Sequence, residues 1–534
     1  MNNRNVLSLV LCGHAPFVRH PEIINPSQEL WLFESISETY IPLLEVLDRL
    51  DRELVPFRIG LSLSASLCHM LCDDFLVQRY LEYTDKQITF GEQELERTAN
   101  DSGLNSLVKH NYDRIVEKKV FFTERCENNI LKGFDHHQKK GRLEILATAA
   151  TWAFLPFFTE YPEAIQAQFE MAISNYKAIF GRIPQGFWLP EFGWKAELDS
   201  WLRAYNLAYT IVDTHALAFA APLAEKGSFY PVRTPMGIAV FGRDFYASEQ
   251  VNKMIRNPLY RYGGRDQGFE LPAEWLMPFL GPQGIRNGTG YRYWASGEDG
   301  SGKLLYNPAK ANEAAGIHAR SFLEACCQRL KSASELLNGP SLSLCAFDAD
   351  SFGRFWHEGY EFIETLFREG VKSEEIQFMT PSEYLCKPDS ASFQTLVPEF
   401  SSSGINGYAE TWLDASNDWM YRHTMRALDR MVELVERFPN SSGLKERALN
   451  QAARELLLVT ASDWAKMLYR QECADYARGR IEASLRNFTT IYEALGSNYI
   501  STEWLTQLEK RNNIFPNVNY RVFRRKHENK TSIT

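Results

Sequence analysis

The chain has 534 residues, more than the roughly 250–300 residues at which a single hydrophobic core stops growing, so we expect two or three packed domains. Hydrophobic residues make up 45% and charged residues 23% of the chain, which is typical of a globular protein and excludes a disordered one. The formal net charge is -9 and no Lys/Arg cluster forms a long basic face, which argues against nucleic acid or an anionic membrane surface as a partner.

An apolar run opens the chain at Val6–Leu11, shortly after Arg4. It is short for a signal peptide, has no small-residue cleavage site and leads into a polar turn, so it predicts a buried first strand. No stretch approaches the roughly 18 apolar residues of a membrane span. The nine cysteines form no C-x-x-C pair, which fits neither a zinc site nor a disulfide framework. We expect reduced thiols, no metal or other cofactor, and a cytoplasmic location.

Short apolar runs alternate with amphipathic segments over the first 390 or so residues. The candidate strands are Val6–Leu11, Arg58–Leu63, Leu143–Ala147, Gly186–Leu189, Ala208–Val212, Ala239–Phe241 and Leu342–Phe347. Helical spacing between them is clearest at Ala164, Phe169, Ala172 and Tyr176, before the fourth run. This alternation predicts a parallel α/β architecture.

Several of these runs end in a polar or acidic residue. These residues are His14, Glu191, Asp213 and Asp348. Functional groups at the carboxyl ends of strands are typical of the active site of a β/α barrel. An open doubly wound sheet places its ligands in the same way, so the pattern leaves both folds possible.

Two further regions have a helical pattern without clear strands. Residues 67–133 are charged and predict a helical insertion. From Asp418 the apolar spacing predicts a helical bundle, with one face at Leu428, Met431, Val432 and Val435 and another at Leu449, Ala453, Leu456, Leu457 and Thr460. We therefore expect a barrel domain over 1–400 and a helical domain over 401–534. Ser401–Gly404 is a linker by composition, or a loop that reaches the active site.

The densest chemical segment is GFWLPEFGW at residues 186–194. Glu191 lies at a strand end between Trp188 and Trp194, and aromatic faces beside a carboxylate suit a sugar ring. Such a carboxylate would stabilise an oxocarbenium-like transition state. The structural alternative is a glutamate paired with an arginine among tryptophans that only pack.

A second segment, CAFDADSFGRFWHEG, places Asp348 and Asp350 directly after an apolar run. In isolation D-x-D also suits a magnesium or calcium site, but no further acidic cluster lies at ligand spacing. Two carboxylates from separate strands suit retaining glycoside chemistry, in which they lie about 5–5.5 Å apart. We interpret Asp350 as a partner that supports Asp348.

The chain resembles glycoside hydrolase family 57, within it the branching-enzyme and amylase-like subgroup. The similarity is collinear and nearly end to end, through LVLCGHAPFVRHPE, GRLEILATAATWAFLPF, GFWLPEFGW, AFDADSFGRFWHEG and VTASDWAKML. It implies an α/β fold with a (β/α)7 barrel, a helical insertion and a C-terminal helical bundle that closes over the cleft. It also implies action on α-1,4-glucans without a metal, with Glu191 as nucleophile and Asp348 as general acid/base.

The resemblance implies a substrate-binding set as well. Its members are His14, Trp188, Arg265, Trp356, Trp412, Asp463 and Trp464. Arg243 and Arg265 are the weaker candidates, because salt-bridged structural arginines are the commoner case.

Seven positions depart from the family pattern, and most carry a histidine or an aromatic residue in the family. They are Cys12, Trp152, Lys226, Trp294, Arg354, Phe355 and Ser403. Each hydrogen bond lost this way would cost about 0.5–1.5 kcal/mol. Three hypotheses follow: a retuned 1,4-alpha-glucan branching or hydrolysing enzyme, a non-catalytic α-glucan-binding or regulatory descendant, or a different glycosidic specificity.

Two of these departures carry specific expectations. Arg354 near the acid/base would favour the ionised form of Asp348, although the first chemical step needs a protonated acid. Lys226 stands where branching members have a loop tyrosine, and it cannot stack as tyrosine does. We therefore expect a lower ratio of transfer to hydrolysis than in tyrosine-bearing relatives.

Overall fold

The computed structural model describes residues 4–387 and 392–525. Within these residues, seven parallel strands follow one another in the order β10-β1-β2-β3-β4-β5-β7. Their bounds are β1 (Asn5–Gly13), β2 (Ile59–Leu63), β3 (Leu143–Thr148), β4 (Gly186–Trp188), β5 (Tyr209–Val212), β7 (Ala239–Gly242) and β10 (Leu342–Asp348). All seven strands predicted from the apolar runs are confirmed.

The sheet curls into a barrel instead of remaining open. β1 pairs in parallel with β10 on one side and β2 on the other. At the remaining edge, the amide of Asp244, just after β7, donates to the carbonyl oxygen of Leu344 in β10 at 2.7 Å. Buried side chains such as Val10, Leu146 and Phe241 fill the interior. The fold is therefore a (β/α)7 barrel, and the open doubly wound alternative is excluded.

The N-terminal end of the barrel is closed by a short segment after β10. Strand β11 (Ile376–Phe378) pairs with the start of β1, and α14 (Pro381–Leu385) follows it. Tyr384 of α14 packs edge-on against Phe241 inside the barrel, with ring centroids 6.1 Å apart. Strand β11 was not predicted, because three residues are too few to show a period of two.

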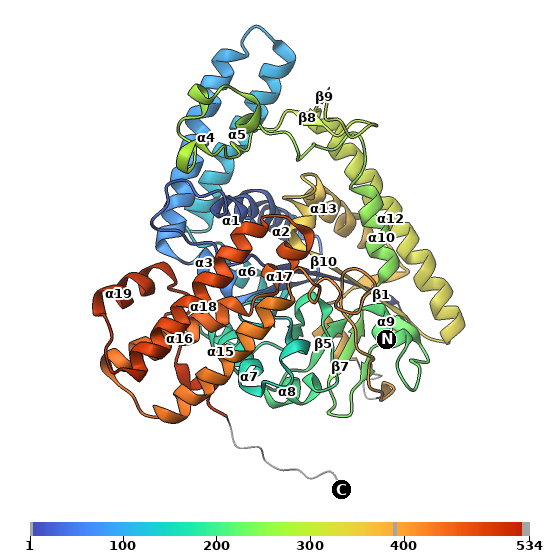
Figure 1. Ribbon diagram of the computed structural model, residues 1–534. Helices are drawn as coiled ribbons and strands as arrows, with labels where there is room; N and C mark the ends of the chain where they lie inside the picture. The colour runs from blue at the N-terminus through green and yellow to red at the C-terminus, as the bar shows by residue number, and fades with distance from the viewer. Residues whose placement is uncertain (1–3, 388–391, 526–534) are drawn as a thin grey trace.

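Between β2 and β3 the chain forms the predicted helical insertion. Its helices are α3 (Ala65–Leu71), α4 (Asp74–Arg97), α5 (Ser102–Val120) and α6 (Ile130–Lys139). Asp73 and Asp101 cap α4 and α5, because each carboxylate accepts a hydrogen bond from a backbone amide of the first turn. In Figure 1 these two long helices project from the barrel as a hairpin.

A second excursion, residues 255–307, packs against α4 (Figure 1). It lies between α10 (Phe245–Met254) and α12 (Pro308–Leu337) and contains the short hairpin of β8 (Trp294–Ala295) and β9 (Leu304–Leu305). Tyr291 donates from its hydroxyl to the carbonyl oxygen of Gln87 at 2.9 Å. The sequence did not predict this excursion, because its short turns carry no sustained apolar period.

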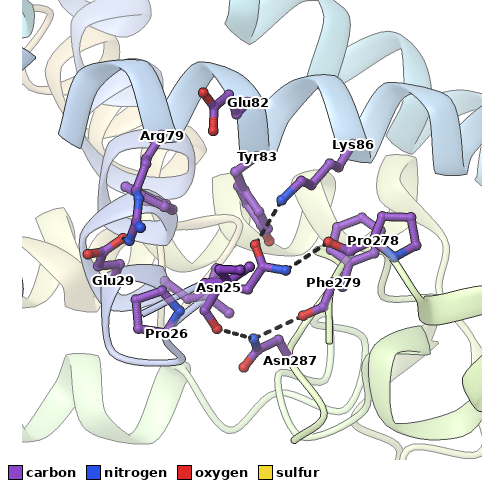
Figure 2. A pocket seen from close by; sticks show the side chains of 13 residues that line it. Asn25, Pro26, Glu29, Arg79, Glu82, Tyr83, Lys86, Pro278, Phe279 and Asn287 are labelled. Atoms are coloured by element: carbon purple, nitrogen blue, oxygen red, sulfur yellow. Dashed lines mark hydrogen bonds and ion pairs between the residues drawn. The ribbon is translucent and has the colours of Figure 1, made fainter. Parts of the chain in front are cut away.

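A cavity of about 220 Å³ marks the joint between the two excursions and the loop before α1 (Glu29–Ser35). Figure 2 shows Asn25 at its centre, donating to the carbonyl oxygen of Pro278 at 3.0 Å and accepting from Lys86 at 2.8 Å. The Asn287 amide donates to the carbonyl oxygen of Asn25 at 2.8 Å. The amide groups that line this cavity thus hydrogen-bond to backbone carbonyl oxygens of the other segments. These bonds hold the two excursions and the loop before α1 together.

The C-terminal region is helical, as the spacing predicted. Its helices are α15 (Asp418–Arg437), α16 (Gly443–Val459), α17 (Ser462–Arg470), α18 (Ala474–Gly496) and α19 (Thr502–Arg511). The region docks on the barrel where the chain leaves β3: Ala153 forms an antiparallel bridge with Ala461, and the Ser462 amide donates to the Trp152 carbonyl oxygen at 3.1 Å. Within the described residues, no helix is both long and apolar enough to cross a bilayer.

Candidate active site

The C-terminal ends of the parallel strands bring the predicted carboxylates to one edge of the barrel. Asp348 ends β10, and Glu191 lies in the turn after β4. Cys12 of β1 is the register partner of Asp348. Burial raises the pKa of its thiol, and the charges of Asp348 and Glu191 raise it further. Both carboxylates therefore act on one buried thiol at the C-terminal end of β1.

Glu191 sits in a constrained turn and receives several donors. Its backbone is left-handed, with φ 56° and ψ 24°, a conformation that costs a non-glycine residue of order 1 kcal/mol or more. The Trp152 indole N–H donates to Oε1 at 3.0 Å, and the Ser403 hydroxyl donates to Oε2 at 3.3 Å. Lys466 Nζ lies 4.0 Å from Oε1. Ser401–Gly404 is therefore a loop that reaches the site, and no arginine pairs with Glu191 among its described contacts.

Asp348 is set apart from Glu191 by its surroundings. Asp348 is the one solvent-exposed residue of β10, although the protein atoms packed around it reduce the hydration of its carboxyl. Burial and the nearby charge of Asp350 raise the pKa of Asp348 to about 7. Asp350 is held in place by Ser35 at 2.8 Å and Thr39 at 2.7 Å. Its position behind Asp348 is the supporting one that we expected.

The expectation that Arg354 keeps Asp348 ionised is wrong. Its guanidinium donates to Glu34 at 3.0 Å and lies 3.8 Å from Asp350. Burial opposes ionisation of Glu34, but Arg292 and Arg354 outweigh it and lower the pKa of that carboxyl. Arg354 therefore acts on Glu34 and also lowers the pKa of Asp350, instead of pairing with Asp348. Its neighbour Phe355 is 61% exposed.

The raised pKa of Asp348 predicts a pH-dependent stability difference for Asp348→Asn. An unfolded aspartate has a pKa of about 3.9, whereas the folded value is about 7, so between these values the folded protein binds the extra proton. Raising the pH through this window destabilises the wild type. We expect Asp348→Asn to be the more stable protein, by a margin that grows from about pH 4 to pH 7. Thermal unfolding of both proteins at a series of pH values measures this difference in stability. A difference that stays constant or shrinks as the pH rises would contradict the raised pKa of Asp348.

His14 links the barrel to the C-terminal helices. One ring nitrogen lies 2.9 Å from the Ser64 hydroxyl and the other 2.9 Å from an Asp463 carboxylate oxygen. Its ring stacks on Trp152 with centroids 4.5 Å apart and planes 9° apart. His14 and Asp463 are therefore brought together beside Glu191, although their roles toward a substrate stay predictions.

Two polar residues of α17 that reach Glu191 were missed from the sequence. Besides Lys466, the Ser462 hydroxyl lies 3.5 Å from Glu191 Oε1. A usable signal was present, because Asp463 was already a candidate and residues three apart share one helix face. The site is completed by the helical region as much as by the barrel.

The four predicted tryptophans are not on the open surface of the mouth. Trp188 points into the barrel interior and packs on Phe192 at 4.8 Å. Trp356, Trp412 and Trp464 are fully buried, each 2% exposed or less. The contacts of all four are those of core residues, and substrate binding by them stays a prediction.

The two weaker arginine candidates are both salt-bridged. Arg265 pairs with Glu270 at 2.5 Å and lies over the ring of Trp294 at 4.3 Å. Arg243 pairs with Asp213 at 2.7 Å. These are the contacts of structural arginines, and binding of a substrate by Arg265 stays a prediction.

Lys226 lies at the opposite end of the barrel. Its amine sits 4.0 Å from the centroid of the Tyr230 ring, and both line a cavity with Gly339 and Pro340, which precede β10. Asp348 ends that seven-residue strand, so at about 3.3 Å per residue the two lie on the order of 20 Å apart. The side chain of Lys226 therefore does not border the carboxylates in this structure.

Among the described residues, no group of three or more His, Cys, Asp or Glu side chains is arranged to hold a metal ion. All nine cysteines are free thiols.

In the comparison with known proteins, two family models match different parts of the chain. Residues 8–393 match glycosyl hydrolase family 57, and residues 423–523 match the C-terminal region of 1,4-alpha-glucan branching enzymes. The alpha-amylase AmyC of Thermotoga maritima is 34% identical with a TM-score of 0.91, covering 98% of this chain and 99% of that one. The GH57-type branching enzyme of Pyrococcus horikoshii is 26% identical with a TM-score of 0.88, covering 98% and 97%. A 1,4-alpha-glucan branching enzyme of Thermococcus kodakarensis is 27% identical over 96% of this chain and 77% of its own length.

Proposed function

Because the chain belongs to glycosyl hydrolase family 57, we propose that it is a retaining enzyme that cleaves α-1,4-glucosidic bonds and passes the segment to a glucan 6-hydroxyl or to water. The observation that carries the proposal is the contrast between its two carboxylates. Glu191 faces N–H and O–H donors and a cation, whereas Asp348 has its pKa raised to about 7. A carboxylate that faces several donors suits the nucleophile, and a carboxyl with a raised pKa suits the acid.

The chemistry proceeds in two displacements. In the first, a Glu191 oxygen attacks the anomeric carbon, the bond to the leaving oxygen breaks, and that oxygen takes the proton of Asp348. In the second, the Asp348 carboxylate removes a proton from the acceptor hydroxyl, which attacks the anomeric carbon and releases Glu191. Each displacement inverts the anomeric carbon, so the two displacements together retain its configuration.

The Trp152 indole fits this role for Glu191. It donates to Oε1 at 3.0 Å, and the stack on His14 fixes its ring. This oriented donor helps to set the direction of the carboxylate. Trp152 thereby supplies positioning at a place where the family pattern has a histidine, which supports an active, retuned site over a non-catalytic glucan-binding protein.

An assay on amylose tests the proposal and separates its outcomes. The purified chain is incubated with amylose, and the iodine complex and the reducing ends are followed together. We expect the iodine colour to fall, with few new reducing ends if the segment is passed to a glucan hydroxyl and many if it is passed to water. Because Lys226 lies beside Gly339 and Pro340, before β10 and far from Asp348, its replacement of the loop tyrosine gives no reason in this structure to favour either acceptor. Unchanged amylose alongside retained binding would replace the enzyme by a glucan-binding protein.

A further inference from the structure

Lys466 approaches the two carboxylates from the C-terminal helical region. It lies in the second turn of α17, three residues after Asp463, and its Nζ is 4.0 Å from Glu191 Oε1. The docking of Ser462 and Ala461 on the segment after β3 holds the start of α17 against the barrel. This docking brings the amine of Lys466, whose side chain is 38% exposed, beside Glu191.

We infer that Lys466 is a positioning residue that supplies one positive charge shared by Glu191 and Asp348 through both halves of the reaction. This inference rests on the proposed function, because it concerns the exchange of charge between the nucleophile and the acid/base.

The charges near Lys466 support the inference. Glu191 is the main cause of the raised pKa of the Lys466 amine, and Asp348 and Asp463 raise it further, whereas burial and Arg470 lower it. Electrostatic interaction is mutual, so the ammonium attracts the Glu191 carboxylate that it faces at 4.0 Å. It also acts on Asp348, whose pKa it lowers against the larger effects of burial and Asp350. His14, which lies 2.9 Å from an Asp463 carboxylate oxygen, also lowers the pKa of Asp348.

The charge balance explains why a shared cation is useful. Before the first displacement Glu191 is a carboxylate and Asp348 is protonated. Afterwards Glu191 is an ester without charge, and Asp348 is a carboxylate because its proton has left with the cleaved oxygen. The negative charge has moved from one residue to the other, while Lys466 stays the positive charge beside both. The trio is neutral in both states, so neither state leaves a carboxylate without a compensating charge.

Lys466→Met tests the inference through the pH profile of kcat/KM. Methionine keeps the unbranched chain and removes the charge. Without the cation both carboxylates bind protons more readily, so we expect both limbs of the bell-shaped profile to move up by about 1 pH unit. The ratio of variant to wild-type kcat/KM should therefore rise with pH by about 100-fold, from about 0.1 on the acid limb to about 10 on the alkaline limb.

Two further variants separate charge from structure. Lys466→Arg restores the cation and should return the profile toward the wild type. Arg470→Met removes a cation from the same helix without removing one beside Glu191, and its profile should overlay the wild type. A Lys466→Met profile with unmoved limbs, whether activity is kept or lost uniformly, would overturn the inference.

A titration without substrate separates this inference from the proposed function. Protein labelled with ¹³C at aspartate and glutamate carboxyls is titrated by NMR, with Glu191→Gln and Asp348→Asn assigning the two signals. Movement of both midpoints upward in Lys466→Met supports the shared charge even if amylose is not turned over. Unmoved midpoints overturn it, while absence of turnover by the wild type removes the proposed function alone.

Discussion

Replacing Glu191 by alanine is expected to lower kcat on α-1,4-glucan on the order of 10⁵-fold, the largest effect of any single change in this chain. The substitution removes the atom that forms the covalent bond to the anomeric carbon. It also leaves the Trp152 N–H and Lys466 without the carboxylate that they face at 3.0 and 4.0 Å. These contacts lie in the site at the end of the barrel, so we expect turnover to be lost while the chain stays folded. Circular dichroism and thermal unfolding would verify the fold of the variant.

Rescue by azide identifies the role of the missing group. With an α-glucosyl fluoride as substrate, azide can enter the space left by Glu191→Ala and attack the anomeric carbon from the same side. The product should be the β-glucosyl azide, because only one displacement occurs. Glu197→Ala, which removes a carboxylate six residues further along the chain, is the matched control and should retain wild-type kcat. Turnover of glucan that survives in Glu191→Ala would remove Glu191 from the nucleophile position.

The barrel could be predicted from the sequence because each of its strands has a local signal in the sequence. Each strand is a mostly apolar run that is buried on both faces, as in Leu342–Phe347. The acidic residue Asp348 that follows this run marks its carboxyl end. Helices such as α7 (Pro162–Phe180) repeat their apolar residues with a period that is visible within a few turns. The family motifs then placed Glu191 and Asp348 at the same edge of the sheet.

The surroundings of the carboxylates could not be predicted in the same way, because their partners are distant in the chain. Asp463 reaches His14 across 449 positions, and Glu34 neutralises Arg354 across 320. No local pattern encodes which charge meets which after folding. The sequence therefore suggested that Arg354 would favour the ionised form of Asp348. In the folded chain Arg354 forms its salt bridge with Glu34 instead. Trp464, which the family resemblance assigned to the substrate, is buried in the fold, and its contact with a substrate stays a prediction.

Asp348→Ala is expected to show a loss that depends on the leaving group. General acid catalysis contributes about 10²–10⁴-fold, so kcat on amylose should fall by that range. A substrate with a fluoride leaving group needs little protonation, and its first displacement should remain fast. The glucosyl–Glu191 ester should then accumulate, because the variant also lacks the base that activates the acceptor, and mass spectrometry of the intact chain would detect it.

The stereochemistry and the pH profile complete the test of Asp348. Azide should release the accumulated ester as the α-glucosyl azide, the configuration opposite to that from Glu191→Ala, because two displacements precede release. In the wild type, kcat/KM should fall as the pH rises through about 7, since the acid must be protonated and its pKa is raised to about 7 by burial and by Asp350. That limb should be absent in Asp348→Ala. If the variant keeps the limb near pH 7, another group is the acid; if it yields the β-azide, the two carboxylates have the reverse roles.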